Sequence, residues 1–182
     1  MQKVNAIEKP IVFAENQRFR QIWLWVVIMI PVFTSLYTLI YQTILGNDFG
    51  NHPMPDPLVI LFAILFGFAL PFFFYLMELR TRVTSDGIYI RFYPIHKKWL
   101  FLSLNELMKF EKTEYRPILE YGGWGIRMGK HGKAYNISGN MGIRFSLSSD
   151  KGLLVGTQKA DEFENALENI KSGEVRSMDH SI

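Results

Sequence analysis

Two apolar stretches decide how this chain is organised: residues 22–45 read IWLWVVIMIPVFTSLYTLIYQTIL, and residues 58–77 read LVILFAILFGFALPFFFYLM. Neither stretch contains Asp, Glu, Lys or Arg. An α-helix rises about 1.5 Å per residue, so about 20 apolar residues cover the roughly 30 Å hydrocarbon core of a bilayer. The sequence therefore predicts a transmembrane hairpin over residues 22–77, with spans at 22–45 and 58–77.

The first stretch is predicted to be an anchor and not a cleaved signal peptide. The basic residues before it would suit a signal peptide, but the apolar run is longer than the usual core of about 7–15 residues. The chain then continues into Gly46-Asn47-Asp48-Phe49, which lacks the small-residue pattern of a cleavage site. Residues 1–21 form a cytosolic or interfacial segment in this prediction.

Basic residues flank the hairpin on one side only. Arg18 and Arg20 precede the first span, and Arg80 and Arg82 follow the second. The link at 46–57 contains neither Lys nor Arg. Because cytoplasmic loops carry the excess of Lys and Arg, this asymmetry predicts that both termini are cytoplasmic and that the link lies outside. The predicted location is the cytoplasmic (inner) membrane of a cell, crossed twice.

Composition excludes several classes of site. The 182 residues contain no cysteine, which removes disulfides, thiolate nucleophiles and thiolate metal sites. The net charge of +3 is too weak to indicate a nucleic-acid partner, which requires a concentrated basic face. The four histidines show no ligand spacing, so we expect neither a metal nor another cofactor. No Gly-x-Ser-x-Gly or other catalytic motif occurs, which favours a non-enzymatic protein.

The interiors of the spans indicate packing more than transport. Pro31 and Pro71 each remove a helical hydrogen bond, which predicts kinked or tilted helices. Ala63, Gly67 and Ala69 are small enough to support close helix packing. Charged residues inside a span are the usual mark of a transport pathway, and neither span contains one.

From Glu78 onward the apolar period changes to two. Asp86-Gly87 lies between two alternating runs, a strong signal for a β-hairpin with a type I′ turn. Ile88, Ile90 and Phe92 are predicted to face a core, with the residues between them on the other face. Further short strands are expected at 98–102, 105–115, 121–135, 143–147 and 153–155, with a turn at Asp150-Lys151-Gly152.

The last predicted element is an amphipathic helix. Phe163, Ala166, Leu167 and Ile170 recur at i, i+3, i+4 and i+7 and form one apolar stripe. Acidic residues gather in its first turns, where they are favourable against the helix dipole, and Gly173 offers a stop. The predicted fold class is therefore α+β, a two-helix transmembrane hairpin followed by an antiparallel β-sheet or barrel domain at 78–182 with a C-terminal amphipathic helix.

Three features together resemble one family: the two-span hairpin, the strand pair TRVTSDGI at 81–88, and the closing helix. With these features the chain resembles bacterial two-span membrane proteins with a PH-like domain. Residues 120–127 (EYGGWGIR), 134–136 (AYN) and 156–158 (GTQ) look like those of an uncharacterised subgroup. The resemblance implies a domain that acts as a scaffold or binding module. Phosphoinositide binding does not carry over, because the first-hairpin turn is not basic.

A glycine-dense stretch lies at 122–132, with Gly122, Gly123, Gly125, Gly129 and Gly132. Its spacing fits neither a dinucleotide fingerprint nor a P-loop. We expect these glycines to serve tight turns and bulges in a curved sheet.

Five residues are candidate headgroup contacts: Arg80, Arg82, Lys97, Lys98 and Trp99. If the first β-hairpin leaves the membrane directly, these side chains sit near anionic headgroups, where each positive charge adds about 1 kcal/mol of attraction. The alternative is that Arg80 and Arg82 only express the positive-inside bias.

Trp124 and Arg127 form a candidate interaction surface. Three residues apart, they would point to opposite faces of a regular strand unless a bulge intervenes. Trp124 is predicted to be a core or interface anchor, and Arg127 a surface charge.

The predicted function is that of a non-enzymatic membrane protein, which presents a PH-like binding or scaffold domain at the cytoplasmic face. Its expected partners are membrane lipids, with a protein partner or a second copy as further candidates, and no nucleic acid. Two alternatives stay open. One is a membrane-anchored enzyme with a site near Trp124 and Arg127, and the other is a small transporter or channel component.

Overall fold

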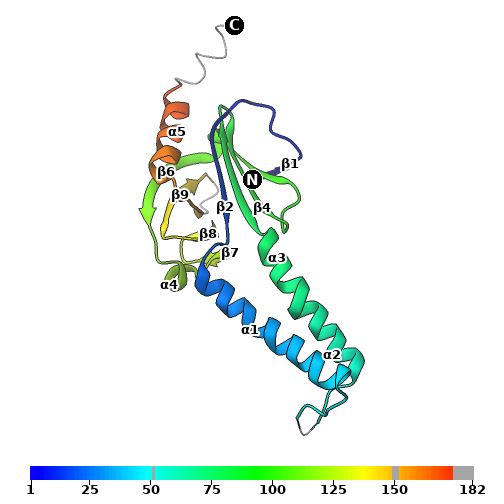
Figure 1. The fold of residues 1–182 in the computed structure, drawn as a ribbon. Coiled ribbons are helices and arrows are strands. Elements are labelled where there is room, and N and C mark those ends of the chain that lie inside the picture. The colour runs from blue at the N-terminus through cyan, green and yellow to red at the C-terminus, as the bar shows by residue number, and fades with distance from the viewer. Residues whose placement is uncertain (51, 149–151, 174–182) are drawn as a thin grey trace. The chain divides into compact units, whose positions relative to one another are not determined.

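The computed structural model describes residues 1–50, 52–148 and 152–173. These residues form two compact units: unit 1 comprises Met1–Arg18 and the described residues from Glu78 onward, and unit 2 is Phe19–Met77. The coarse prediction of an α+β chain with two long apolar helices and a C-terminal helix is confirmed (Figure 1). Asp150 and Lys151 of the predicted turn, and His180, lie outside the described residues.

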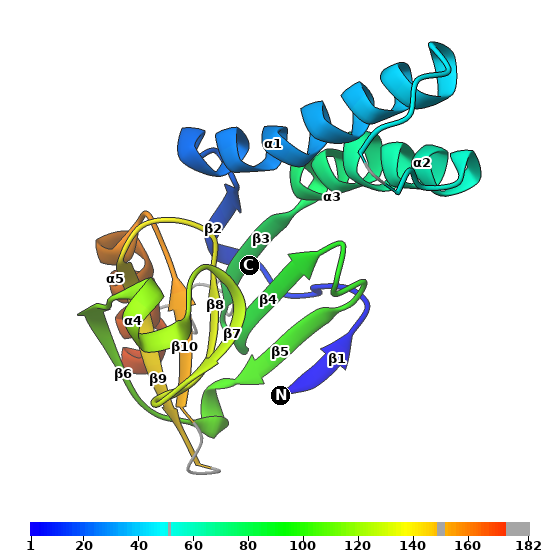
Figure 2. The ribbon, with the colours of Figure 1, turned by 90° about the horizontal axis from the view of Figure 1, so that it is seen from below.

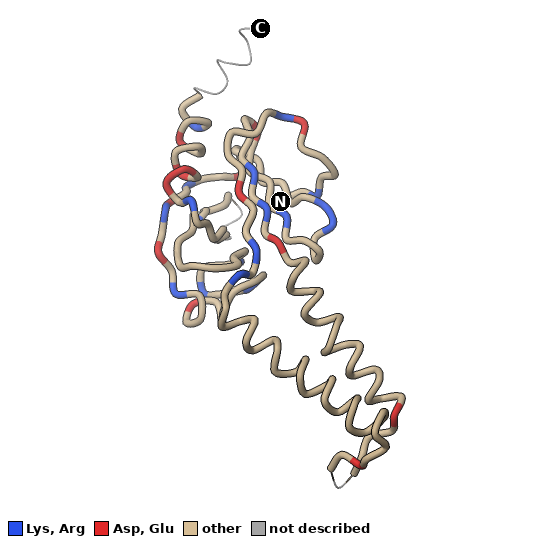
Figure 3. The backbone as a smooth tube through the Cα atoms, viewed as in Figure 1, with Lys and Arg blue, Asp and Glu red and all other residues tan. Residues whose placement is uncertain are grey.

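Unit 2 consists of two helical segments joined by a link. The first combines α1 (Ile22–Thr38) with the π-helical η1 (Leu39–Ile44), and the second combines α2 (Asp56–Phe62), the π-helical η2 (Ala63–Ala69) and α3 (Leu70–Leu76). Both segments are long and apolar enough to cross a membrane. Only 17% of an apolar stretch of 18 residues in each segment is buried. Figure 3 shows no Lys or Arg along them. The acidic residue Asp56 lies in the first turn of α2.

Small residues bring the two helical segments together. Ala63 and Gly67, four residues apart, are both buried. A Cβ atom on Gly67 would lie 3.3 Å from Leu36 Cδ2 and 3.5 Å from Ser35 Oγ, so a larger side chain would push the helices apart. Ala63 and Gly67 thus serve packing within the chain, whereas Ala69 is exposed.

Polar groups close the hairpin where its link begins and ends. The Nε2 atom of Gln42 donates to the Met54 carbonyl and, over 3.3 Å, to Asp56 Oδ1. Thr43 Oγ1 donates to the same carboxylate oxygen over 3.4 Å. These bonds satisfy polar groups in a segment that is otherwise apolar.

Unit 1 contains two five-stranded sheets, seen together in Figure 2. Sheet A has the order β1-β5-β4-β3-β2 and is antiparallel throughout. Its strands are β1 (Gln2–Val4), β2 (Ile11–Arg18), β3 (Glu78–Thr84), β4 (Gly87–Tyr93) and β5 (Trp99–Ser103). The short helix η3 (Leu104–Glu106) leads to the second sheet.

Sheet B has the order β6-β9-β10-β8-β7. Its strands are β6 (Leu107–Glu114), β7 (Gly125–Gly129), β8 (Gly132–Asn136), β9 (Met141–Leu147) and β10 (Gly152–Gly156), with α4 (Pro117–Tyr121) between β6 and β7. An antiparallel sheet was predicted, but β10 and β8 run parallel. The reason is that β10 inserts between β9 and β8. The chain reverses direction twice between β8 and β10, so these two neighbouring strands point the same way.

The N-terminal residues belong to sheet A. Strand β2 pairs with β3 from Ile11 opposite Thr84 to Arg18 opposite Glu78. The sequence predicts residues 1–21 as a segment apart from the β domain, whereas Gln2–Val4 and Ile11–Arg18 are strands of sheet A. The pairing was missed because β2 and its partner are separated by the whole of unit 2, so no local turn signal connects them.

The hairpin between β3 and β4 forms as predicted, but its turn lies one residue earlier. Thr84 pairs with Gly87, so the two turn residues are Ser85 and Asp86. Gly87 is the first residue of β4, and a Cβ atom there would collide with the Leu102 carbonyl oxygen on β5. Close approach of a neighbouring strand therefore explains this glycine. Asp86 supports the turn by accepting hydrogen bonds from Thr84 and, over 3.0 Å, from Tyr89.

The core lies between the two sheets and the helix α5 (Ala160–Ser172). The predicted stripe of α5 is buried at all four positions, and the helix ends at Gly173 in a left-handed conformation, as expected. Phe163 stacks on Phe13 of sheet A at 4.8 Å between ring centroids and lies 6.1 Å from Phe145 of sheet B. One helix residue thus joins both sheets.

Candidate functional site

The register of sheet A gathers arginines on its outer face. Arg80 lies opposite Asn16 on one side and Arg91 on the other, and Arg82 lies opposite Tyr89. Ile88, Ile90 and Phe92 alternate with these residues and are fully buried on the inner face, as predicted. We call the following set the arginine face: Arg18, Arg80, Arg82, Arg91, Tyr89, Tyr93 and Trp99.

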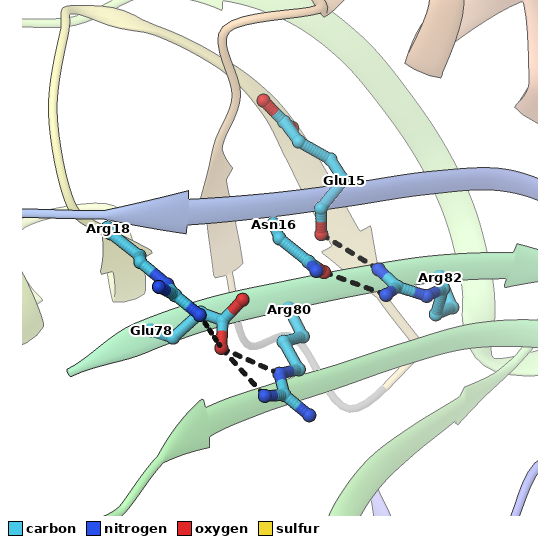
Figure 4. Close-up of polar contacts among 6 residues, drawn as sticks. All are labelled: Glu15, Asn16, Arg18, Glu78, Arg80 and Arg82. Atoms are coloured by element: carbon cyan, nitrogen blue, oxygen red, sulfur yellow. Dashed lines mark hydrogen bonds and ion pairs between the residues drawn. The ribbon is translucent and has the colours of Figure 1, made fainter. Parts of the chain in front are cut away.

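One carboxylate serves two of these arginines. Glu78, although buried, accepts hydrogen bonds from Arg80 Nε over 2.9 Å and Arg80 Nη2 over 2.7 Å (Figure 4). The same Oε2 atom lies 3.7 Å from Arg18 Nη2. Because Arg18 ends β2 and Glu78 begins β3, this ion pair joins the strand that leads into α1 to the strand that follows α3.

Arg82 is held by neutral oxygens. Its Nη1 donates to the carbonyls of Glu15 and Thr81 over 2.9 and 2.8 Å, and its Nη2 donates to Asn16 Oδ1 over 2.7 Å (Figure 4). Partial burial and the nearby Arg80 charge lower the pKa of Arg82 from its ordinary value. The guanidinium still carries its charge at neutral pH, since arginine is not deprotonated in proteins.

Arg91 lies between two aromatic rings. Its guanidinium carbon is 5.5 Å from the Tyr93 ring centroid and 5.8 Å from that of Trp99. Trp99 also faces Arg82 at 5.9 Å. In the described part of the chain no carboxylate pairs with Arg91, and its buried Nε has no hydrogen-bond partner. The rings hold the cation in place without neutralising it.

The arginine face therefore carries more positive than negative charge. The face has four guanidinium groups and one carboxylate, Glu78, which pairs with Arg18 and Arg80 only. The planar fork of arginine suits the paired oxygens of phosphate and carboxylate groups. The flanking rings provide the amphipathic surface that is enriched at membrane interfaces. This arrangement can bind an anionic group by electrostatics and hydrogen bonding.

Three of the five predicted headgroup contacts belong to this face: Arg80, Arg82 and Trp99. Lys97 and Lys98 lie in the connection between β4 and β5 and are exposed. Sequence reasoning missed Arg18, Arg91 and the aromatic residues of β4. Period-two alternation placed Arg91 and Tyr89 on the outer side, but it could not show that β5 flanks β4 or that β2 brings Arg18 to the same face.

Trp124 and Arg127 do come together, though not as a strand pair. Trp124 precedes β7 and is partly exposed, so it is not a core residue. Its Nε1 donates to the Gly139 carbonyl over 3.0 Å. Arg127 is exposed, as predicted, and its Nε donates to the Trp124 carbonyl over 3.0 Å.

The glycine-dense stretch has a conformational explanation. Gly122, Gly123, Gly125 and Gly132 adopt positive φ angles. Gly129 does not, but a Cβ atom there would collide with the Glu120 carbonyl oxygen. The expectation that these glycines serve turns and close approach of the backbone is confirmed.

A buried polar contact joins the two sheets. Glu15, on the inner face of β2, accepts hydrogen bonds from Thr157 Oγ1 over 2.5 Å and from the Gln158 amide over 2.8 Å. Gln17 Nε2 donates to the Gly156 carbonyl over 2.7 Å. Every carboxylate oxygen of Glu15 is used, so this contact positions the start of α5 and is not open to a ligand.

The described residues show no group of three His, Asp or Glu side chains that could hold a metal ion. Burial raises the pKa of Tyr115 to about 12, and burial with the Asp86 hydrogen bond raises that of Tyr89 to about 12. Both phenols stay protonated at neutral pH and are not bases. Burial, with the charges of Lys133 and Lys3, lowers the pKa of His96.

Comparison with curated proteins and with solved structures found no match. Residues 4–168 match a family of unknown function, DUF6141. That range includes both helical segments, all of sheet B, strands β2 to β5 of sheet A and most of α5. The chain belongs to the DUF6141 family.

Proposed function

We propose that this chain is an integral membrane protein of the cytoplasmic membrane, whose two apolar helices form a transmembrane hairpin and hold unit 1 at the inner surface. There, unit 1 acts as a non-enzymatic module that binds anionic lipid headgroups through the arginine face. The observation that carries the proposal is the pairing of β2 with β3. Neighbouring strands enter and leave the hairpin, and the arginine face begins at that junction.

Exposure supports the membrane part of the proposal. Apolar side chains cover the two helical segments on their outer sides, with Ile22, Phe33 and Phe68 among the most exposed. Soluble monomers rarely leave apolar patches of such extent in water, whereas a bilayer would cover them. The Lys and Arg residues close to the ends of the helices, with none in the link, favour the inner side for unit 1.

The short connections between unit 1 and the helices support lipid headgroups as the ligand. Three residues separate Arg18 from α1, and Met77 alone separates α3 from β3. If the helices span a bilayer, Arg18 and Arg80 lie within reach of its headgroups, where each basic residue adds about 1 kcal/mol of attraction to an anionic surface. Lipid phosphate and serine carboxylate groups match the guanidinium forks.

A PH-like ancestry for unit 1 is part of the same proposal. Two packed sheets closed by a C-terminal helix suit that architecture. Strands β1 and β2 and the parallel pair of β8 with β10 would be additions to it.

The membrane part is tested by extraction and topology. We expect the full chain to stay in the membrane fraction at alkaline pH and to dissolve only in detergent. Since the chain has no cysteine, N47C and S172C each introduce a unique thiol. An impermeant maleimide should label position 47 in intact cells, and position 172 only after permeabilisation. Alkaline release of the protein, or the reverse labelling, contradicts the proposal.

The lipid part is tested in nanodiscs with the R80Q/R82Q/R91Q variant. The distance of unit 1 from the bilayer is followed by energy transfer from a dye on M108C to labelled headgroups. We expect closer approach in phosphatidylserine discs than in phosphatidylcholine discs, and loss of that difference in the variant.

The matched control is K109Q/K130Q/K171Q, which removes three positive charges elsewhere in unit 1 and should keep the difference. Equal behaviour of the two triple variants would contradict binding by the arginine face. Crosslinking in intact cells then tests whether the arginine face binds a protein instead of lipid. A protein captured through the arginine face, with no lipid dependence in the discs, would replace lipid as its ligand.

A further inference from the structure

The short helix α4 exposes two large apolar side chains on unit 1. Ile118 is 66% exposed and Leu119 is 76% exposed. They are neighbours on one turn of a five-residue helix, where nothing in their own backbone requires apolar residues. Two exposed residues before α4, Glu114 and Arg116, are charged.

This exposure is held by the fold and does not result from a frayed segment. Tyr121, on the same helix, is buried against Tyr115 with ring centroids 5.9 Å apart. Glu120 accepts a hydrogen bond from the Arg116 amide over 2.7 Å and lies 3.7 Å from Arg144 on β9. One side of α4 is thus fixed on sheet B, which leaves Ile118 and Leu119 on the other side.

Helix α4 lies at the end of sheet B that is near the last residues of β2. It follows the end of β6, where Tyr115 donates its amide to the Asn140 carbonyl beside the start of β9. At this same end of sheet B, the Gly156 carbonyl accepts from Gln17, next to the last residue of β2. Figure 1 shows α4 at the end of unit 1 where β2 finishes. This is the end from which the chain leaves unit 1 for the two apolar helices.

The residues around α4 have the composition of an interfacial segment. Trp124 follows the helix and is partly exposed, and Arg116 and Arg127 are exposed on either side. Segments that lie in the headgroup region combine apolar side chains with Trp and with Lys or Arg, since the rings and cations reside at the polar boundary.

We infer that α4 and the turn after it form a second bilayer contact, in which Ile118 and Leu119 enter the boundary between headgroups and acyl chains. The inference rests on the proposed function, because the hairpin must first hold unit 1 at the membrane. With the arginine face it gives unit 1 two contacts, one electrostatic and one apolar. Together they fix the orientation of the domain on the bilayer instead of leaving it to rotate on its tether.

The test places a nitroxide label on L119C in the full chain, in nanodiscs that hold one copy. Power saturation with oxygen, which concentrates in lipid, and with an aqueous nickel chelate reports the depth of the label. M108C is the matched control, since Met108 is 68% exposed and lies at the opposite end of β6. We expect position 119 to be several-fold less accessible to nickel than position 108, and I118D to return it to water.

Each outcome has a definite meaning. Equal nickel accessibility at 119 and 108, in protein that resists alkaline extraction, overturns this inference and leaves the membrane anchor intact. Protein released by alkali overturns the proposed function itself. If position 119 is protected only in discs that hold two copies, α4 binds a second chain and not the bilayer, and the inference fails.

Discussion

The two faces of sheet A are made by the same strands, but they have opposite compositions. On β4 the inner face carries Ile88, Ile90 and Phe92, all fully buried, while the outer face carries Tyr89, Arg91 and Tyr93. The inner face is complete, since α5 and sheet B cover it. The outer face holds guanidinium groups between aromatic rings with one shared carboxylate. Under the proposed function, substitutions on the inner face should lower stability, whereas substitutions on the outer face should weaken contact with lipid.

The largest effect is expected on the inner face, from Phe92→Ala. Removal of a fully buried phenyl ring leaves a cavity and should cost about 3–5 kcal/mol of unfolding free energy. Hydrogen exchange of the β4 amides in detergent micelles measures this loss. A loss below about 1 kcal/mol, as small as that expected for a surface substitution, would contradict the claim that the inner face of sheet A determines its stability.

A smaller effect is expected from Glu15→Gln, which tests the polar part of the inner face. Glutamine presents one amide where the carboxylate accepts two hydrogen bonds, so a donor from Thr157 or Gln158 is left unpaired. The expected cost is about 1–3 kcal/mol, concentrated at the start of α5. Exchange rates of the first α5 amides should rise more than those of β9, and a uniform change would argue against a local role.

On the outer face, Arg91→Gln should change stability by less than about 1 kcal/mol, because the lost interactions are two cation–π contacts at the surface. Contact with phosphatidylserine discs should fall in the same variant. If stability drops as far as in Phe92→Ala while lipid contact is unchanged, the arginine face is a structural feature and not a binding face.

The smallest effect concerns His96, in the connection between β4 and β5. Its pKa is lowered in the folded state, so below the ordinary value of 6.5 the unfolded chain binds more protons than the folded one. Stability should therefore decline as pH falls through that value towards the folded-state pKa, and His96→Gln should flatten this decline. Unfolding curves at several pH values test the sign, and a rise in stability on acidification would contradict it.

The sequence predicted features whose cause is local. The apolar stretches, the alternation around Ile88 and the stripe on α5 can be read from neighbouring residues, because helix and strand periods act over short distances. The Asp86-Gly87 signal gave the correct hairpin and missed its turn by one residue. Gly87 is required by a carbonyl on β5, which no local pattern contains.

Three of the seven residues of the arginine face were predicted, and the others were missed for one reason. Arg80, Arg82 and Trp99 were found because they lie just after an apolar stretch or beside other basic residues. Arg18 joins them only because β2 pairs with β3, although the entire hairpin separates the two strands in sequence. Arg91 joins them only because β4 is placed between β3 and β5.

The sequence by itself determined that this protein has two long apolar helices, a β-rich region behind them and a closing amphipathic helix, since burial patterns repeat at the period of each element. Only the tertiary structure decided that the N-terminal residues complete the sheet, that Arg18 and Arg80 share one carboxylate, and that Ile118 and Leu119 are held outward on unit 1. These features depend on contacts between residues far apart in the chain, which strand pairing creates and local sequence does not encode.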